Sequence, residues 1–176
     1  MTFKKTFLPA LILAVICLVC ALALGVTNRL TEKRIASVER DRYFASAASV
    51  LPEGAVLQEL TVPGVEGFVG RRADGSVLGY AVKASAKGYG GDVLCVVGFD
   101  AEGKILAVSV SAPEETPGLG NNVTKPAFTD QFIGMGTPPV LGEDFDAVTS
   151  ATYSSRAVER AVAEAFSAFE IITKGE

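Results

Sequence analysis

The hydropathy of the chain is dominated by one apolar block near the amino terminus. The segment Phe7–Val26 contains no charged residue. A helix of that length rises about 30 Å, which matches the hydrocarbon thickness of a bilayer. We therefore predict an N-terminal segment, residues 1–28, whose transmembrane helix anchors the chain in the lipid bilayer through Phe7–Val26.

A cleaved signal peptide is the alternative interpretation of this block. Lys4 and Lys5 would form its basic start, and the small residues of Ala21-Leu22-Ala23 could form a cleavage site. The block is long for such a peptide, which favours an uncleaved anchor. Basic residues also follow the block within residues 29–34, so the positive-inside rule does not select an orientation.

The rest of the chain combines a polar helical segment with short strand-like runs. Residues 29–51 contain few helix-breaking residues and predict a helical stalk. Residues 52–176 are predicted to form one domain of the α+β class with a mainly antiparallel sheet. Its apolar runs, separated by turns, predict strands at 67–69, 76–82, 93–99 and 104–111, the last two forming a hairpin.

The last predicted element has the clearest pattern. Apolar residues recur at helical spacing between residues 158 and 169, which predicts an amphipathic helix from about Ser155 to Phe169. Ser154 or Ser155 could cap its amino terminus. A shorter helical piece is expected at Phe128–Phe132.

Composition narrows the chemistry that this domain can perform. The formal net charge is −4 at pH 7, which argues against a nucleic-acid partner. The chain contains no histidine, so it lacks the commonest general base and the commonest metal ligand. We therefore expect neither a catalytic side chain nor a metal site. Cys17 and Cys20 lie inside the apolar block and are interpreted as residues that pack in lipid.

Three segments carry residue types that packing alone explains poorly. Residues 87–92 place Tyr89 among three glycines, which indicates close backbone approach or simply a tight turn. Residues 114–122 combine one proline with two glycines, which indicates a shaped loop that suits a flat heteroaromatic ring. Residues 146–155 crowd hydroxyl groups before a helix, which indicates a Ser/Thr-rich cap or a phosphate site.

These segments resemble those of the G subunit of Rnf-type ion-translocating oxidoreductases, and more distantly the C subunit of the sodium-pumping NADH:quinone reductase. The resemblance rests on Gly88-Tyr89-Gly90-Gly91, on Glu115-Thr116-Pro117-Gly118-Leu119-Gly120, and on Asp146–Thr152 followed by Ser154-Ser155-Arg156-Ala157-Val158. It covers essentially the whole chain and implies one transmembrane helix followed by an FMN-binding domain.

In this family FMN is joined by a phosphoester to the last threonine of an Asp-x-x-(Ser/Thr)-Gly-Ala-Thr motif, in a reaction for which a dedicated flavin transferase uses FAD. The resemblance assigns that role to Thr152, with Ser150 in place of the usual glycine. A serine would be strained there if the position required a positive φ. The implied cofactor-binding residues are Tyr89, Glu115, Thr116, Gly118, Leu119, Gly120, Thr149, Ser150, Ala151 and Thr152.

The resemblance also implies a function and a location. It implies an electron-transfer subunit of a membrane complex that couples ferredoxin:NAD⁺ electron transfer to Na⁺ or H⁺ translocation, with other membrane redox subunits as partners. The flavin domain would face outside the cytoplasm, at the cell (inner) membrane. Two alternatives remain: an anchored module that holds its ligand noncovalently, and an anchored extracytoplasmic flavin module that serves a separate reductase.

Overall fold

The structure is a computed structural model that describes residues 2–174. The chain divides into two compact units, the first ending at Arg42 and the second beginning at Tyr43. The predicted domain boundaries after residues 28 and 51 remain predictions. Their outer limits, residue 1 and residues 175–176, lie outside the described residues.

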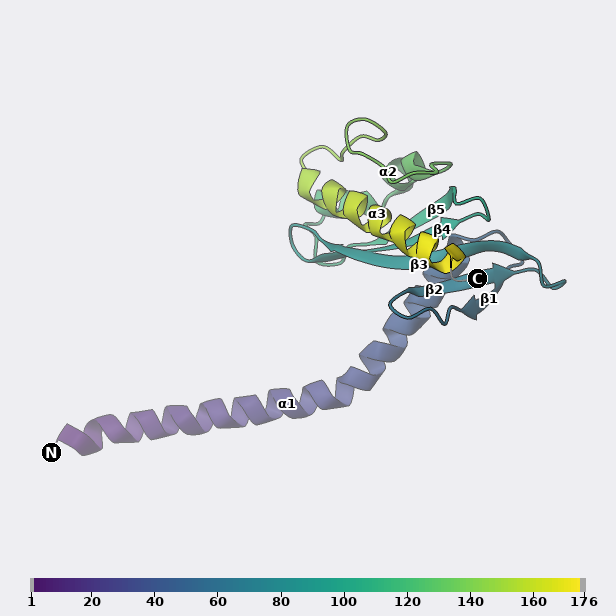
Figure 1. The fold of residues 1–176 in the computed structure, drawn as a ribbon. Helices are drawn as coiled ribbons and strands as arrows, with labels where there is room; N and C mark the ends of the chain where they lie inside the picture. The colour runs from purple at the N-terminus through teal and green to yellow at the C-terminus, as the bar shows by residue number, and fades with distance from the viewer. Residues whose placement is uncertain (1, 175–176) are drawn as a thin grey trace. The chain divides into compact units, whose positions relative to one another are not determined.

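The first unit is formed by a single helix, α1 (Thr2–Ser49), which also contributes its last turns to the second unit (Figure 1). The described side chains of Phe7–Val26 are exposed. Among the described residues, α1 is the helix long and apolar enough to cross a membrane, and its most apolar window has a mean hydropathy of 2.9. The predicted apolar helix and the predicted stalk helix are therefore continuous in α1.

The second unit contains an antiparallel sheet whose five strands follow the order of the chain. The strands are β1 (Val56–Glu59), β2 (Glu66–Arg71), β3 (Val77–Lys87), β4 (Asp92–Phe99) and β5 (Ile105–Ser111). The α+β class and the antiparallel sheet are thus confirmed, together with the hairpin of β4 and β5. The sequence pattern missed β1, which is short and mostly exposed, and it ended β3 too early.

The remaining elements follow the sheet. They are η1 (Gly120–Thr124), α2 (Pro126–Thr129), η2 (Asp130–Phe132) and α3 (Thr152–Lys174). The short helical piece expected near Phe128 is confirmed, and α3 is longer at both ends than the predicted helix. The prediction that Ser154 or Ser155 caps α3 is wrong, because both residues lie inside the helix and are buried.

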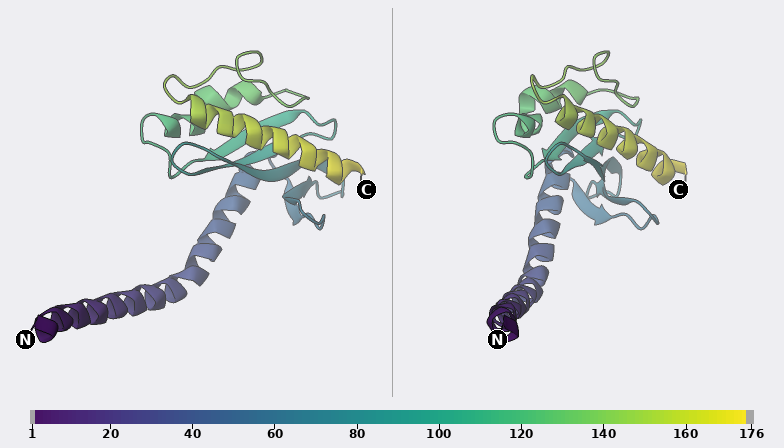
Figure 2. Two further views of the ribbon diagram at one scale, coloured as in Figure 1. Left: turned by 60° about the vertical axis from the view of Figure 1, so that its left-hand side comes forward. Right: turned by 90° about the vertical axis from the view of Figure 1, so that its left-hand side faces the viewer.

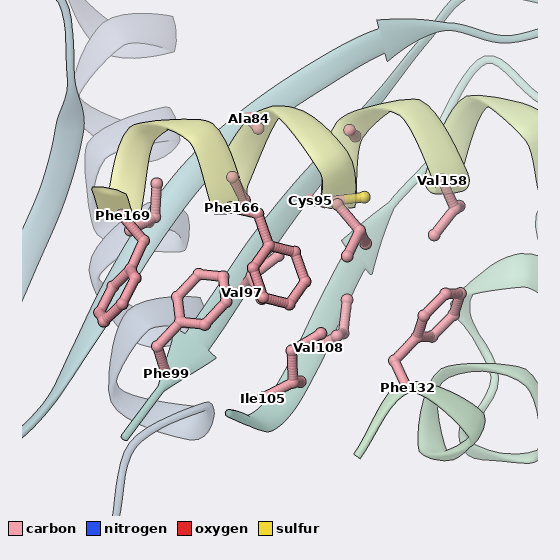
Figure 3. Close-up of a cluster of buried hydrophobic side chains, with 14 of the residues drawn as sticks. Ala84, Cys95, Val97, Phe99, Ile105, Val108, Phe132, Val158, Phe166 and Phe169 are labelled. Carbon is pink, nitrogen blue, oxygen red and sulfur yellow. The ribbon is translucent and has the colours of Figure 1, made fainter. Parts of the chain in front are cut away.

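The core lies between α3 and one face of the sheet (Figure 2). Alternate residues of each strand point to the same face, so Cys95, Val97 and Phe99 of β4 all point toward α3 (Figure 3). The Phe99 ring packs against the rings of Phe166 and Phe169, at centroid distances of 5.0 and 4.8 Å. This packing fixes the position of α3, and hence of its amino terminus, relative to the sheet.

The opposite face of the sheet is covered by the end of α1 and the residues just after it. Ala47, Val50 and Leu51 are buried against Phe68 of β2 and Val96 of β4. Both faces of the central strands are therefore buried. As a result, exposed groups that could bind a ligand lie at the ends of the strands and in the loops.

Candidate functional site

The tight turn between β3 and β4 holds the tyrosine–glycine segment. The Gly88 N–H donates to the Gly91 carbonyl (2.8 Å), which places Tyr89 and Gly90 at the tip of the hairpin. Arg160 of α3 donates from Nη2 to the carbonyl of the last residue of β3 (2.6 Å). The segment is therefore a tight turn, and a side chain of α3 holds it against that helix.

The loop after β5 is shaped by hydrogen bonds within itself. The Thr116 carbonyl accepts from the N–H groups of Leu119 (3.1 Å) and Asn121 (3.2 Å). The Asn122 side-chain amide donates to the Gly118 carbonyl (2.7 Å). Gly118 has a φ of 76°, which lies in the left-handed region that glycine adopts readily. The loop thus presents Thr116 and Leu119 in a defined conformation, as the sequence pattern indicated.

The Glu115 carboxylate joins this loop to two other segments. Its side chain is only 3% exposed. Oε1 accepts from the backbone N–H groups of Tyr89 (2.7 Å) and Gly90 (3.3 Å), and Oε2 accepts from the Ser154 hydroxyl (2.9 Å). A buried carboxylate requires such donors to compensate for the water it has lost. Glu115 therefore connects the β3–β4 turn, the loop after β5 and the first turn of α3.

The closeness of these segments explains two glycines of the motifs. A Cβ at Gly88 would overlap Oε1 of Glu115, and a Cβ at Gly120 would overlap its Oε2 and the Ser154 hydroxyl. Neither position can therefore hold a larger residue without moving the carboxylate. Glycine at these two positions allows the backbone to lie close to the Glu115 carboxylate.

The turn before α3 is held by its own set of contacts. The Asp146 N–H donates to Oε1 of Gln131 (2.8 Å), and the Val148 N–H donates to the Ser155 hydroxyl (3.0 Å). The Ala151 N–H then donates to the Val148 carbonyl (2.9 Å), which closes the last turn before the helix. The geometry of residues 146–151 is thus fixed from both sides.

Ser150 occupies a conformation that rarely suits a side chain. Its φ is 63°, and among the described residues it is the one non-glycine residue with a positive φ. An L-residue in the left-handed region costs about 1–2 kcal/mol. The position where the motif usually has glycine therefore does require a positive φ in this chain, and Ser150 bears the strain.

The five hydroxyl groups near the start of α3 are in different environments. Ser154 and Ser155 are buried. The Ser154 hydroxyl is hydrogen-bonded to Glu115, and the Ser155 hydroxyl is hydrogen-bonded to the backbone of the preceding turn. Thr149 and Thr152 are exposed, like Ser150, but Thr149 lines a neighbouring pocket. Thr152 is the first residue of α3 and lines the pocket beside the glycine loop.

That pocket has a volume of about 340 Å³ and collects most of the predicted cofactor-binding residues. Gly118 and Thr149 are the predicted residues that do not line it. Two lining residues, Tyr153 and Ser154, were not predicted, although they directly follow Thr152 in the sequence. The lining residues are Tyr89, Glu115, Thr116, Leu119, Gly120, Ser150, Ala151, Thr152, Tyr153 and Ser154.

The chemistry of this pocket fits a phosphate-bearing heteroaromatic group such as FMN. The amino terminus of a 23-residue helix lies at one side, where unpaired N–H groups and the helix dipole favour an anion. Leu119 and the two tyrosines supply apolar and aromatic surface for a flat ring. Thr152, at the helix start, provides an exposed hydroxyl where a phosphate would lie.

Comparison with known families and structures agrees with this geometry. Residues 88–167 match the FMN-binding domain family, and residues 1–43 match the RnfG N-terminal region. The crystal structure of NqrC from Shewanella oneidensis has the same fold, with a TM-score of 0.54 and 21% identity over 72% of this chain and 71% of that one. The fold class expected from the sequence is thereby supported independently.

Two relatives are similar to the chain over nearly its whole length. The G subunit of an ion-translocating oxidoreductase complex from Stutzerimonas stutzeri is 30% identical over 92% of this chain and 80% of its own. The G subunit of the Na⁺-translocating ferredoxin:NAD⁺ oxidoreductase complex from Acetobacterium woodii is 28% identical over 98% and 95%. The chain therefore belongs to the family of G subunits of ion-translocating oxidoreductase complexes, and it contains an FMN-binding domain.

Proposed function

We propose that this chain is an electron-transfer subunit that carries FMN covalently on Thr152, within a membrane complex coupling ferredoxin:NAD⁺ electron transfer to Na⁺ or H⁺ movement. The observation that carries the proposal is the exposed Thr152 hydroxyl at the start of α3, on the wall of the pocket. The name of the Acetobacterium woodii relative supports the reaction. The other partners are the remaining redox subunits and a flavin transferase that attaches FMN.

The role of the protein in this proposal is to hold the cofactor and orient it. FMN accepts and passes on electrons, so the chain needs no acid or base of its own. Thr152 holds the phosphate at the helix terminus, and Thr116, Leu119 and Tyr89 contact the ring. The transmembrane part of α1 contains no charged residue, so it offers no path for an ion. Ion movement therefore belongs to other subunits.

Thr152→Ala should remove the covalent flavin. The variant lacks the hydroxyl that forms the ester, while the buried Ser154 and Ser155 cannot replace it. In-gel flavin fluorescence after SDS denaturation should vanish in Thr152→Ala and persist in Thr173→Ala, a matched change near the other end of α3. Fluorescence that survives in Thr152→Ala would refute the attachment site.

Ser150→Gly should stabilise the chain without loss of flavin. Glycine relieves the positive-φ strain but loses more entropy on folding, so we expect the free energy of unfolding to rise by about 0.5–1 kcal/mol. Urea unfolding of the detergent-solubilised chain, followed by circular dichroism, measures the change. Gly142→Ser is the matched control in the opposite direction. The φ of Gly142 is 86°, so placing a serine there should lower the free energy of unfolding by a similar amount. A less stable Ser150→Gly would show that the serine side chain makes a compensating contact.

Glu115→Ala should loosen all three segments of the site together. It leaves the partly buried N–H groups of Tyr89 and Gly90 and the buried Ser154 hydroxyl without their acceptor, which should lower the free energy of unfolding by about 2–4 kcal/mol. Glu115→Gln keeps one oxygen for the two N–H groups and should lose clearly less. Urea unfolding measures the free energy of unfolding of the wild type and of both variants. An equal decrease in Glu115→Ala and Glu115→Gln would show that an oxygen acceptor at this position does not stabilise the domain.

The proposal also places the domain outside the cytoplasm, as the resemblance to the family implies. A cysteine at the exposed turn residue 101 (Ala101→Cys) should then react with an impermeant maleimide in intact cells. The native Cys95 should stay unlabelled, because burial raises the pKa of its thiol to about 12. Thr2→Cys is the control and should react only after the cells are permeabilised. The reverse pattern would place the domain in the cytoplasm.

A further inference from the structure

Arg156, an exposed residue in the second turn of α3, differs from the other arginines of the domain. Those arginines each donate a hydrogen bond to an oxygen atom of the chain; they are Arg71, Arg72 and Arg160. Within the described residues, the Arg156 guanidinium makes no hydrogen bond and no ion pair. Residues 43–176 contain 17 acidic and nine basic residues, so its lack of a partner does not reflect a shortage of acidic side chains.

The helix geometry places Arg156 on the same face as Thr152. Residues four positions apart on an α-helix are neighbours, with Cβ atoms about 5–6 Å apart. Helical side chains also point back toward the amino terminus, so a long side chain covers the turn before its own position. Thr152 and Arg156 are four positions apart, and both are exposed. The guanidinium can therefore reach a group that is bonded to the Thr152 hydroxyl oxygen.

The charges at the start of α3 are the reverse of those that stabilise a free helix. Acidic side chains are favourable in the first turn, where the helix dipole has its positive end, and cations there are unfavourable. The first turn of α3 contains no acidic residue, and Arg156 follows in the second turn. Two positive contributions therefore lie close together. An anion supplied by a ligand would balance them.

We propose that the Arg156 guanidinium binds the phosphate of FMN that is esterified to Thr152. This inference rests on the proposed attachment of FMN, and it adds a binding residue that does not line the pocket. A phosphodiester carries one negative charge and two non-bridging oxygens, and the planar guanidinium presents N–H donors in a fork that matches them. The contact fixes the phosphate end of the cofactor against α3, and the pocket orients the ring.

A double-mutant cycle on the full-length chain tests the proposal. The four chains are wild type, Arg156→Gln, Thr152→Ala and the double variant, each produced in cells with the flavin transferase and extracted in detergent. In the chain that carries FMN, Arg156→Gln should raise the equilibrium constant of urea unfolding by about twofold to fivefold, the range for an exposed ion pair. In the Thr152→Ala chain, which lacks the ester, the same change should not raise it, because the cation is then unfavourable beside the helix dipole.

Two further variants separate a direct contact from a general effect of charge. Arg156→Lys keeps the charge but presents no planar fork, so it should retain part of the stabilisation. Arg72→Gln removes the same charge from an exposed residue of the β2–β3 turn, at the opposite end of β3 from the β3–β4 turn. Its effect on unfolding should be equal with and without FMN. Both arginines are exposed, so these changes leave the core intact.

Phosphorus NMR gives a readout of the phosphate itself. In a detergent that contains no phosphorus, the attached FMN gives one phosphodiester resonance. Arg156→Gln should shift this resonance relative to wild type, Arg156→Lys should shift it less, and Arg72→Gln should leave it unchanged. The resonances of all chains that carry FMN should coincide after denaturation in SDS, because unfolding removes the contact.

The possible results distinguish the arginine contact from the proposed attachment. An equal effect of Arg156→Gln on unfolding with and without FMN, or an unshifted phosphodiester resonance, would overturn the contact and leave the ester on Thr152 in place. A wild-type chain whose intact mass shows no FMN would overturn the attachment and the contact together.

Discussion

The site depends on one buried carboxylate. Glu115 is nearly inaccessible to water, and its two oxygens are satisfied by the β3–β4 turn on one side and by Ser154 of α3 on the other. An uncompensated buried carboxylate would be strongly destabilising, so the three segments must come together for the domain to fold. The absence of a Cβ at Gly88 and Gly120 is what lets them approach this closely.

The carboxylate and the turn before α3 together bind two of the hydroxyl groups near the start of that helix. Ser154 donates to Glu115, and Ser155 bridges the preceding turn, so both hydroxyls are committed to structure. Thr152 lies earlier on the helix, before these buried positions, and remains exposed. Ser150, two residues before Thr152, has the positive φ with which the chain enters the helix. Thr116, Ser150 and Thr152 all present exposed hydroxyls on the pocket wall, and Thr152 is the one of these three that lies in α3.

Local patterns and long-range contacts explain what the sequence could and could not predict. The β4–β5 hairpin follows from alternating apolar residues, and the amphipathic part of α3 follows from helical spacing. The true start of α3 was missed because Ser154 resembles a cap, whereas its hydroxyl bonds a carboxylate 39 positions away in sequence. Tyr153 was not predicted although it directly follows Thr152, because the family motif ends at Thr152 and the contact with Tyr89 exists only in the folded chain. The family resemblance raised a positive φ at Ser150 only as a condition, since the motif usually has glycine there, and the structure shows that the condition holds.

The exposed pocket and the proposed covalent attachment of FMN would solve one physical problem together. A subunit that exchanges electrons with neighbours needs its flavin ring close to the protein surface, yet a shallow surface pocket buries little of the ring and binds it weakly. The covalent bond that we propose at Thr152 would remove that conflict, because the tether would set a high local concentration whatever the noncovalent affinity. The pocket would then need only to orient the ring. The tightly held β3–β4 turn and the start of α3 provide fixed walls for that purpose.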